Sequence, residues 1–188
     1  MSAASRRTPL RPPPTQEQDW LESLDTFGAD PATLDPAHFR KSVSLFATGI
    51  VVLTCEDEEG NVHGATVNSF TSVSLQPPTV LVSLKPGKTH RIISRTGRYG
   101  ACILNEAQQN FSAHFSGRPQ EAVRPDFQVR DRLPTLRHCL AWFECVVVQK
   151  VQVHDHTLFV AEVTACGNHD GTPLMFFGSR YHRPAIAV

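Results

Sequence analysis

The sequence has no excess of charge of either sign and no long apolar run. Its 18 Lys and Arg residues balance 18 Asp and Glu residues, so the formal net charge is zero. Proteins that bind nucleic acid usually carry a basic excess or a basic stripe, so this balance argues against that class. No stretch approaches the roughly 20 apolar residues of a membrane-spanning helix. The 188 residues are expected to form one domain with an extended tail.

Several short motifs are also missing. No G-x-G-x-x-G occurs, which argues against a Rossmann domain for a dinucleotide. No C-x-x-C occurs, and the five cysteines are odd in number and scattered. They are interpreted as reduced thiols that behave as small apolar residues, which predicts a cytoplasmic protein. The N-terminus lacks an apolar signal core, and its prolines at 12–14 disfavour the amphipathic helix of an organelle-targeting peptide.

The first 34 residues differ from the rest of the chain. Six of the fourteen prolines lie within residues 1–36, and the segment turns from basic to acidic. We therefore expect residues 1–34 to be a flexible Pro-rich N-terminal extension, with a short helix over 16–27. The domain proper is expected to span 35–188.

Strand patterns dominate this domain. Asp35-Pro36 is a helix start signal, and the spacing of Phe39, Val43 and Phe46 predicts a helix that ends at Gly49. Short helices are also expected at 88–96 and 106–116, and a polar loop at 117–138. Runs rich in Val, Ile, Thr and Phe predict seven strands, at 50–55, 62–70, 79–84, 99–104, 141–153, 156–166 and 174–177. Seven strands without a βαβ rhythm favour a mainly β, antiparallel barrel with a few short helices.

The segment 64–84 contains no charged residue, yet nine of its side chains carry a hydroxyl or an amide. Such a composition suits the wall of a site for a polar, planar or phosphorylated ligand, because short hydroxyls and backbone N–H groups can meet a phosphate or a ring edge. An edge strand decorated with Ser and Thr explains the composition equally well. Composition and spacing lead no further than a barrel with one polar groove.

Six blocks in order resemble the flavin reductase-like family, whose members are FMN-binding split-barrel proteins. The family's opening F-x-T-G-V-x-V-V-T stands here at 46–54, and its G-x-T-V-N-S-F-x-S-V-S-x-x-P-P stands at 64–78. Further matches are Thr89, F-S-G at 115–117, D-H-x-x-F-V-x-E-V at 155–163, and Gly178 with Tyr181 and His182. The resemblance covers residues 37–183.

This resemblance implies a Greek-key-like split β-barrel that forms a homodimer, with FMN or FAD in a groove between subunits. The implied positions around the flavin ring and ribityl chain are Thr48 with its neighbours Gly49 and Val51, and Thr66, Val67, Asn68, Ser69 and Ser72. Those implied toward the phosphate are Lys88 and Thr89, with Ser83 nearby. Phe115 would border the ring or the adenosine side. His182, with Gly178 and Tyr181, would face the nicotinamide ring of NADH or NADPH.

Some of these residues have simpler interpretations. His182 could cap the C-terminal tail instead of serving the reaction, and Lys88 with Arg91 and Arg95 could form a solvated helix face. His154 and His156 share a strand face, but spacing marks no third metal ligand, so no metal is expected. Cys55, Cys102 and Cys145 are expected to be core residues, because nothing cationic flanks them.

The resemblance implies an NAD(P)H:flavin oxidoreductase that supplies reduced flavin to a partner monooxygenase or halogenase. The cofactors perform the redox chemistry, and the protein holds the two rings together. Two alternatives remain open: a flavin-binding module without activity, and a relative of pyridoxamine-phosphate oxidase that works without nicotinamide. No nucleic acid and no membrane are expected as partners.

Overall fold

The computed structural model describes residues 34–118, 121–130 and 133–184. The expected Pro-rich extension lies outside these ranges except for Leu34, as does the helix expected at 16–27. The chain divides into two units at Ser42. Among the described residues, no helix is long and apolar enough to cross a membrane.

One helix, α2 (Pro36–Val43), begins where the sequence predicts. The Asp35 carboxylate accepts hydrogen bonds from the backbone N–H groups of Ala37 and His38 at 3.0 and 3.2 Å, and so caps the helix. The predicted end at Gly49 is wrong. The helix stops at Val43, and Thr48–Gly49 instead form strand β1, paired with the C-terminal strand β11 (Met175–Phe177).

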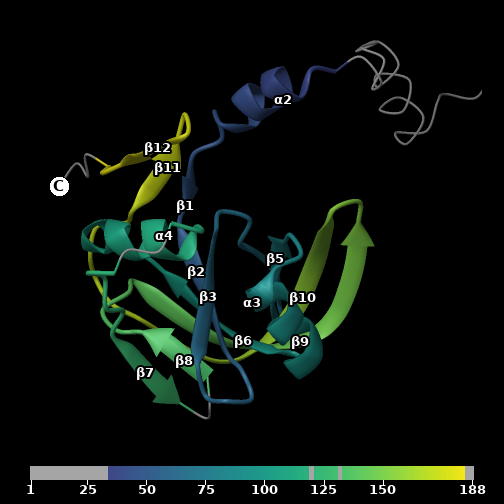
Figure 1. Cartoon of the computed structure of the whole chain (residues 1–188), viewed down its shortest axis with the longest axis vertical. Coiled ribbons are helices and arrows are strands. Elements are labelled where there is room, and N and C mark those ends of the chain that lie inside the picture. Colours follow the sequence, from purple (N-terminus) through teal and green to yellow (C-terminus); the bar gives the residue numbers. More distant parts are fainter. Residues whose placement is uncertain (1–33, 119–120, 131–132, 185–188) are drawn as a thin grey trace, which may run out of the picture. The chain divides into compact units, whose positions relative to one another are not determined.

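The second unit, from Val43 onward, is built from antiparallel strands (Figure 1). Its seven-stranded sheet has the order β3-β2-β6-β9-β10-β5-β4, a second sheet has the order β1-β11-β12, and β7 pairs with β8. The remaining strands are β2 (Val51–Glu56), β3 (Val62–Val67), β4 (Thr71–Leu75), β5 (Pro78–Leu84), β6 (Arg98–Ile103), β7 (Phe127–Arg130), β8 (Leu133–Leu136), β9 (Ala141–Val153), β10 (His156–Asn168) and β12 (Arg180–His182). The helices of this unit are α3 (Lys88–Thr96), the 3-10 turn Glu106–Gln108, and α4 (Gln109–Phe115).

A long hairpin carries the sheet from one half to the other. The first part of β9 pairs with β6, and the first part of β10 pairs with β5. Two register shifts in the pairing of β9 with β10, at Val160/Ala161 and Val163/Ala165, mark β-bulges, which bend a strand and increase its twist. The sheet curls enough for β3 and β5 to contact each other, although β2, β6, β9 and β10 separate them in the sheet order.

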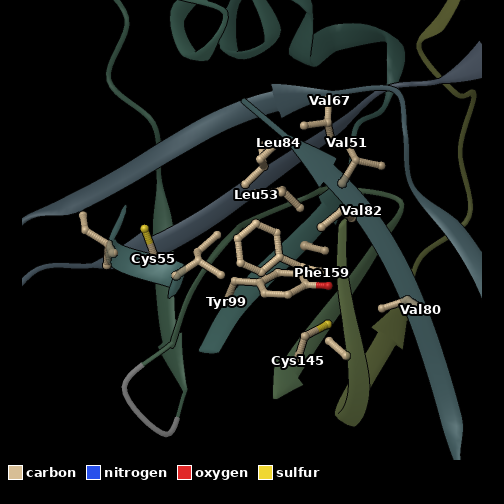
Figure 2. Packing of buried hydrophobic residues seen from close by; sticks show 14 residues of the cluster. Val51, Leu53, Cys55, Val67, Val80, Val82, Leu84, Tyr99, Cys145 and Phe159 are labelled. Carbon is tan, nitrogen blue, oxygen red and sulfur yellow. The ribbon is translucent and has the colours of Figure 1, made fainter. Parts of the chain in front are cut away.

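Strand β2 shows why the core lies where it does. Its run Ile-Val-Val-Leu is apolar at every position, which is typical of a strand buried on both faces. Val51 and Leu53 pack with Val67, Tyr99 and Phe159 in one cluster (Figure 2). The residues on the opposite face contribute to a second cluster: Ile50, Val52, Cys102, Leu104, Leu136, Trp142 and Leu174.

The antiparallel, mainly β fold with short helices is confirmed. Six of the seven predicted strands match within two residues at each end; the one predicted at 62–70 ends at Val67. The polar loop predicted at 117–138 is wrong, because it contains the hairpin of β7 and β8. All four residues of β8 are buried.

Candidate functional site

Three hollows meet at Asn68, in the corner between β3 and β4. The largest is a groove of about 620 Å³ between the wall strands β3 and β5 and the end of α4. Its lining residues are Ala65, Thr66, Val67, Asn68, Ser69, Ser83, Leu84, Lys85, Pro86, Phe115, Ser116 and His156. The chargeless segment 64–84 therefore supplies most of this wall, as a ligand-wall interpretation requires.

The two smaller hollows border the same corner. One, of about 400 Å³, is lined by residues 46–49 and 68–71 with Val51 and Ile103. The other, of about 200 Å³, lies between the wall and the C-terminal hairpin, where Ser112, Phe176 and Tyr181 join Thr66, Val67 and Asn68. Predicted site residues from both ends of the domain thus converge on one region.

Thr66 lines the groove, and its hydroxyl proton is already used in a hydrogen bond within the protein. Its Oγ1 donates to the carbonyl oxygen of Ser112 at 2.7 Å. That carbonyl lies in the last turn of α4, where the four final C=O groups have no partner within the helix. Because the proton points to Ser112, the Thr66 hydroxyl can only accept a hydrogen bond from a ligand.

Ser69 lines the groove and also closes its corner. Its hydroxyl donates to the Ser83 carbonyl oxygen at 3.1 Å and accepts from the Ser83 N–H at 3.0 Å, and so joins the 68–70 corner to β5. Neighbouring Asn68 is exposed, and among the described residues its side-chain amide makes no hydrogen bond. Asn68 can therefore offer a ligand both a donor and an acceptor.

Two features of the wall fit a flat, polar ring. The Thr48 Oγ1 atom is buried beside the second hollow and has no hydrogen-bond partner in the part of the chain that is described. Such atoms normally find a partner, so a bound group would complete this one. Gly64 lets the Phe115 ring lie against the backbone of β3, because a Cβ there would come within 2.6 Å of Phe115 Cδ1.

The C-terminal hairpin carries the remaining predicted residues. Gly178 and Ser179, at φ 57° and 63°, form its two-residue turn, and the Gly178 N–H donates to the Ser44 carbonyl oxygen at 2.7 Å. Gly178 therefore shapes the hairpin. Tyr181 packs edge-on against Phe176, and its hydroxyl is 2.9 Å from Ser112 Oγ.

His182 is exposed at the end of this hairpin. Its Nε2 is 3.0 Å from the Phe177 carbonyl oxygen, and a carbonyl can only accept, so Nε2 carries the proton. In the neutral ring Nδ1 is then an acceptor. The structure does not place His182 among the residues that line the three hollows.

Lys88 and Thr89, which were predicted to lie toward the phosphate, do not line the three hollows. Thr89 is buried in α3, and Lys88 Nζ is 3.7 Å from Asp57 Oδ2, in a separate charged hollow of about 410 Å³. Asp57 holds the turn before β3, where hydrogen bonds from His63 and Asn61 keep the pKa of its carboxyl well below the ordinary range.

Two other basic side chains border the groove. Lys85 Nζ lies 3.0 Å from Asp155 Oδ2, and His156 Nδ1 lies 2.8 Å from Asp155 Oδ1. The hydrogen bonds from Lys85 and His156 lower the pKa of Asp155 to about 2. Asp155 thus holds a lysine and a histidine together at the groove lined by both.

The sequence analysis and the structure differ in detail at this site. Six of the predicted residues line the groove: Thr66, Val67, Asn68, Ser69, Ser83 and Phe115. Ser72 is exposed on β4 and lines none of the three hollows. Lys85, Ser112, Ser116 and His156 were not predicted as site residues, and only the family blocks at 115–117 and 155–163 pointed toward Ser116 and His156.

Cys55, Cys102 and Cys145 are buried, as expected for core residues. Burial raises the pKa of Cys55 and of Cys145 to about 12, which keeps both thiols protonated. Among the described residues no three His, Cys, Asp or Glu side chains come together as a metal site would require.

Comparison with known proteins decides the family. The model of the flavin reductase-like domain matches residues 43–185. The chain belongs to this family. A curated member, the NADH-dependent flavin reductase StyB of Pseudomonas fluorescens, is 56% identical over 153 residues, which cover 79% of this chain and 90% of that protein. The resemblance drawn from the six sequence blocks is thereby confirmed.

Solved structures of flavin reductases share its fold. The styrene monooxygenase flavin reductase SMOB of Pseudomonas putida S12 is 55% identical, with a TM-score of 0.74 over 80% of this chain and 99% of that one. The flavin reductase PheA2 is 40% identical, with a TM-score of 0.78 over 81% of this chain and 100% of the PheA2 chain. The predicted split barrel and the predicted oxidoreductase, which uses a nicotinamide cofactor and a flavin, are confirmed by these relatives.

Proposed function

We propose that this chain transfers hydride from NADH to FMN or FAD held at the Asn68 corner, and passes the reduced flavin to a monooxygenase component. The observation that carries the proposal is the chargeless wall of β3, the corner after it and the end of β5, which meets the C-terminal hairpin at Asn68. The chain's similarity to the NADH-dependent StyB supports NADH as the reductant, and its similarity to a flavin reductase of styrene monooxygenase supports a monooxygenase as the partner.

The residues of the corner supply the hydrogen bonds that a flavin ring needs. Thr66 can accept from an N–H or O–H group, Asn68 can donate and accept, and the buried Thr48 hydroxyl lacks a partner among the described residues. The flavin, when bound, supplies the hydride-accepting chemistry. The protein's part is to orient the ring and leave one face of it open, as the short side chains of the wall allow.

Lys85 and His156 are proposed to hold the phosphate end, in place of Lys88 and Thr89. Both line the groove, and Asp155 fixes both of them from behind. Lys88 is drawn instead toward Asp57. A basic pair on a groove wall is suited to a phosphate monoester or a pyrophosphate, through charge-assisted hydrogen bonds.

His182 is proposed to contact the nicotinamide. With its proton on Nε2 and shared with Phe177, the neutral imidazole presents Nδ1 as an acceptor. The amide N–H of a carboxamide is the matching donor. Gly178 and Tyr181 then hold the hairpin that presents His182.

A homodimer is proposed as the working form. Exposed apolar side chains lie on two strands of the large sheet: Val148, Val151 and Val153 on the outer half of β9, and Val73 and Leu75 on β4. Exposed apolar side chains that follow one another along a strand, as the three valines of β9 do, are suited to a protein–protein interface. The cytoplasmic location expected from the scattered cysteines stays a prediction.

The deciding experiment follows NADH oxidation by the purified full chain, with and without added FMN, FAD or riboflavin. We expect oxidation to depend on added or bound flavin and to exceed the rate without enzyme. A yellow protein whose flavin keeps its oxidised spectrum on anaerobic mixing with NADH and NADPH would contradict the enzyme assignment and favour a flavin-binding module.

A further inference from the structure

A buried hydroxyl joins two parts of the site that the sequence keeps far apart. Ser112 lies in α4, and none of its surface is exposed. Its backbone carbonyl accepts from Thr66 Oγ1 at 2.7 Å, and its side-chain hydroxyl pairs with the Tyr181 hydroxyl at 2.9 Å. One residue thus contacts the flavin wall through its backbone and the C-terminal hairpin through its side chain.

The two contacts can be separated chemically. Replacing Ser112 by Ala keeps the carbonyl that receives the Thr66 proton and removes only the bond to Tyr181. Replacing Tyr181 by Phe removes that same bond from the other side and keeps the ring against Phe176. Replacing Thr66 by Val removes the other contact and leaves the hairpin bond in place.

Two other contacts also hold the hairpin: the Gly178 N–H donates to the Ser44 carbonyl oxygen, and Arg183 Nε lies 3.5 Å from Glu106 Oε2 in an exposed ion pair. β12 has three residues and pairs with β11, which pairs with the two-residue strand β1. His182 is exposed and is next to Tyr181 in the chain. The hydroxyl pair joins β12 directly to α4, and it therefore helps to set the position of His182 relative to the wall.

We propose that Ser112 is a positioning residue that holds the Tyr181–His182 hairpin over the flavin wall, so that its hydroxyl governs use of NADH and not affinity for flavin. The inference rests on the proposed function, in which His182 serves the nicotinamide. Ser112 touches neither cofactor through this bond; it acts through Tyr181.

The test compares Ser112→Ala, Tyr181→Phe and the double variant in the full chain. We expect each single change to raise the KM for NADH about three- to tenfold, the worth of one hydrogen bond, with the Kd for FMN unchanged. The double variant should be no worse than either single variant, because both remove the same bond. Thr66→Val should instead raise the Kd for FMN and leave the KM for NADH unchanged.

A second measurement is independent of turnover. Amide hydrogen exchange without ligands should become faster in residues 175–182 of Ser112→Ala and Tyr181→Phe, and stay unchanged in β3. Tyr99→Phe is the matched control, since Tyr99 is the chain's other tyrosine and its hydroxyl lies beside the Cys145 thiol in the core (Figure 2). It should change neither the KM for NADH nor exchange in the hairpin.

Equal changes in the KM for NADH and the Kd for FMN, additive effects in the double variant, or unchanged exchange in 175–182 would each overturn the role of Ser112. Failure of the proposed function is a different result. It would be seen as wild-type protein that does not oxidise NADH with FMN, while the exchange experiment would still report whether the hydroxyl pair fixes the hairpin. If Ser112→Ala does not fold, Tyr181→Phe alone carries the test, because Tyr181 is only partly buried.

Discussion

At the scale of single residues, the Asn68 side chain lines all three hollows. Among the described residues its amide has no hydrogen-bond partner. Exposed amides are satisfied by water, so the free protein does not need this side chain for stability. A ligand ring that replaces the water would need it for binding.

Asn68→Leu should therefore weaken flavin binding without unfolding the protein. A polar contact left unmatched costs about 1–3 kcal/mol, and we expect the free energy of FMN binding to fall by that amount. Quenching of flavin fluorescence measures it. Asn110→Leu is the control, because Asn110 is also exposed but lies on α4 outside the three hollows. Equal FMN affinity in Asn68→Leu and wild type would show that the flavin lies elsewhere.

His182→Ala tests the opposite side of the site. Removing the Nδ1 acceptor should raise the KM for NADH about tenfold or less, the range for one hydrogen bond, and leave the Kd for FMN unchanged. Steady-state kinetics at saturating FMN and a separate FMN titration give the two values. Exposed His169, at the end of β10, serves as the matched His→Ala control. A parallel loss of both affinities would refute the contact with nicotinamide.

At the scale of elements, the sequence predicted best where burial alone decides the structure. The helix at 88–96 was predicted with its observed bounds, because Ile92 and Ile93 bury one face between basic residues and Gly97 ends it. The strand at 141–153 also matched, since its Val-rich run has no breaker. In these segments the local pattern and the tertiary packing favour the same structure.

The loop prediction at 117–138 failed because a distant contact overrides the local pattern. Residues 133–136 contain a proline and resemble a loop, yet the carbonyl of Pro134 accepts from the buried Thr54 hydroxyl and the segment packs against β2 and β6. Lys88 stands at a helix start, where backbone N–H groups favour an anion, and its ammonium lies 3.7 Å from Asp57 on the β2–β3 turn, so its contact with phosphate stays a prediction. No spacing in the sequence reveals either contact.

The two lysines at the start of α3 and the end of β5 give a matched pair. Lys85→Ala should raise the Kd for FMN about two- to tenfold, because one charged hydrogen bond to phosphate at an exposed position is lost. It should leave the Kd for riboflavin unchanged, since riboflavin has no phosphate. Lys88→Ala should alter neither value. The reverse result, in which Lys88→Ala raises the Kd for FMN but not for riboflavin, would confirm the prediction that Lys88 contacts the phosphate.

The turn between β2 and β3 should make the stability of the folded protein depend on pH. The Asp57 carboxylate accepts from the backbone N–H groups of Glu59 and Asn61 and from His63, and its folded pKa is therefore lowered. A lowered folded pKa means that the stabilisation is complete above the ordinary carboxyl pKa of about 4 and is lost as pH falls below it.

Asp57→Asn should accordingly lower Tm at pH 7, and the difference from wild type should shrink between about pH 4 and pH 3. Thermal unfolding followed by circular dichroism at several pH values measures it. Asp57→Asn also removes the ion pair between Asp57 and the Lys88 ammonium, so Lys88→Ala, which removes only that ion pair, is the control. A Tm difference that stays constant down to pH 3 would mean that the turn is held by something other than the ionised carboxylate.

At the scale of the whole molecule, two exposed valines allow a test of the proposed interface. Val151, on the outer half of β9, is 38% exposed and shares this half of the strand with two other exposed valines, Val148 and Val153. Val129, on β7, is 60% exposed and lies in the separate two-stranded sheet. The exposed fraction alone would favour Val129 as the interface residue, whereas the run of exposed valines along β9 favours Val151.

A buried charge at an interface is costly unless it is paired, so Val151→Glu should dissociate the proposed homodimer. Val129→Glu, the same change on an isolated exposed valine, should leave it intact. Light scattering coupled to size-exclusion chromatography gives the mass of each species, against 20.8 kDa for one chain. If the flavin groove is completed by a second chain, Val151→Glu must also lose FMN affinity as it becomes monomeric, and dilution of wild type must produce the same coupled loss. A wild-type chain that is already monomeric and binds FMN would contradict the homodimer and leave the groove as the whole site.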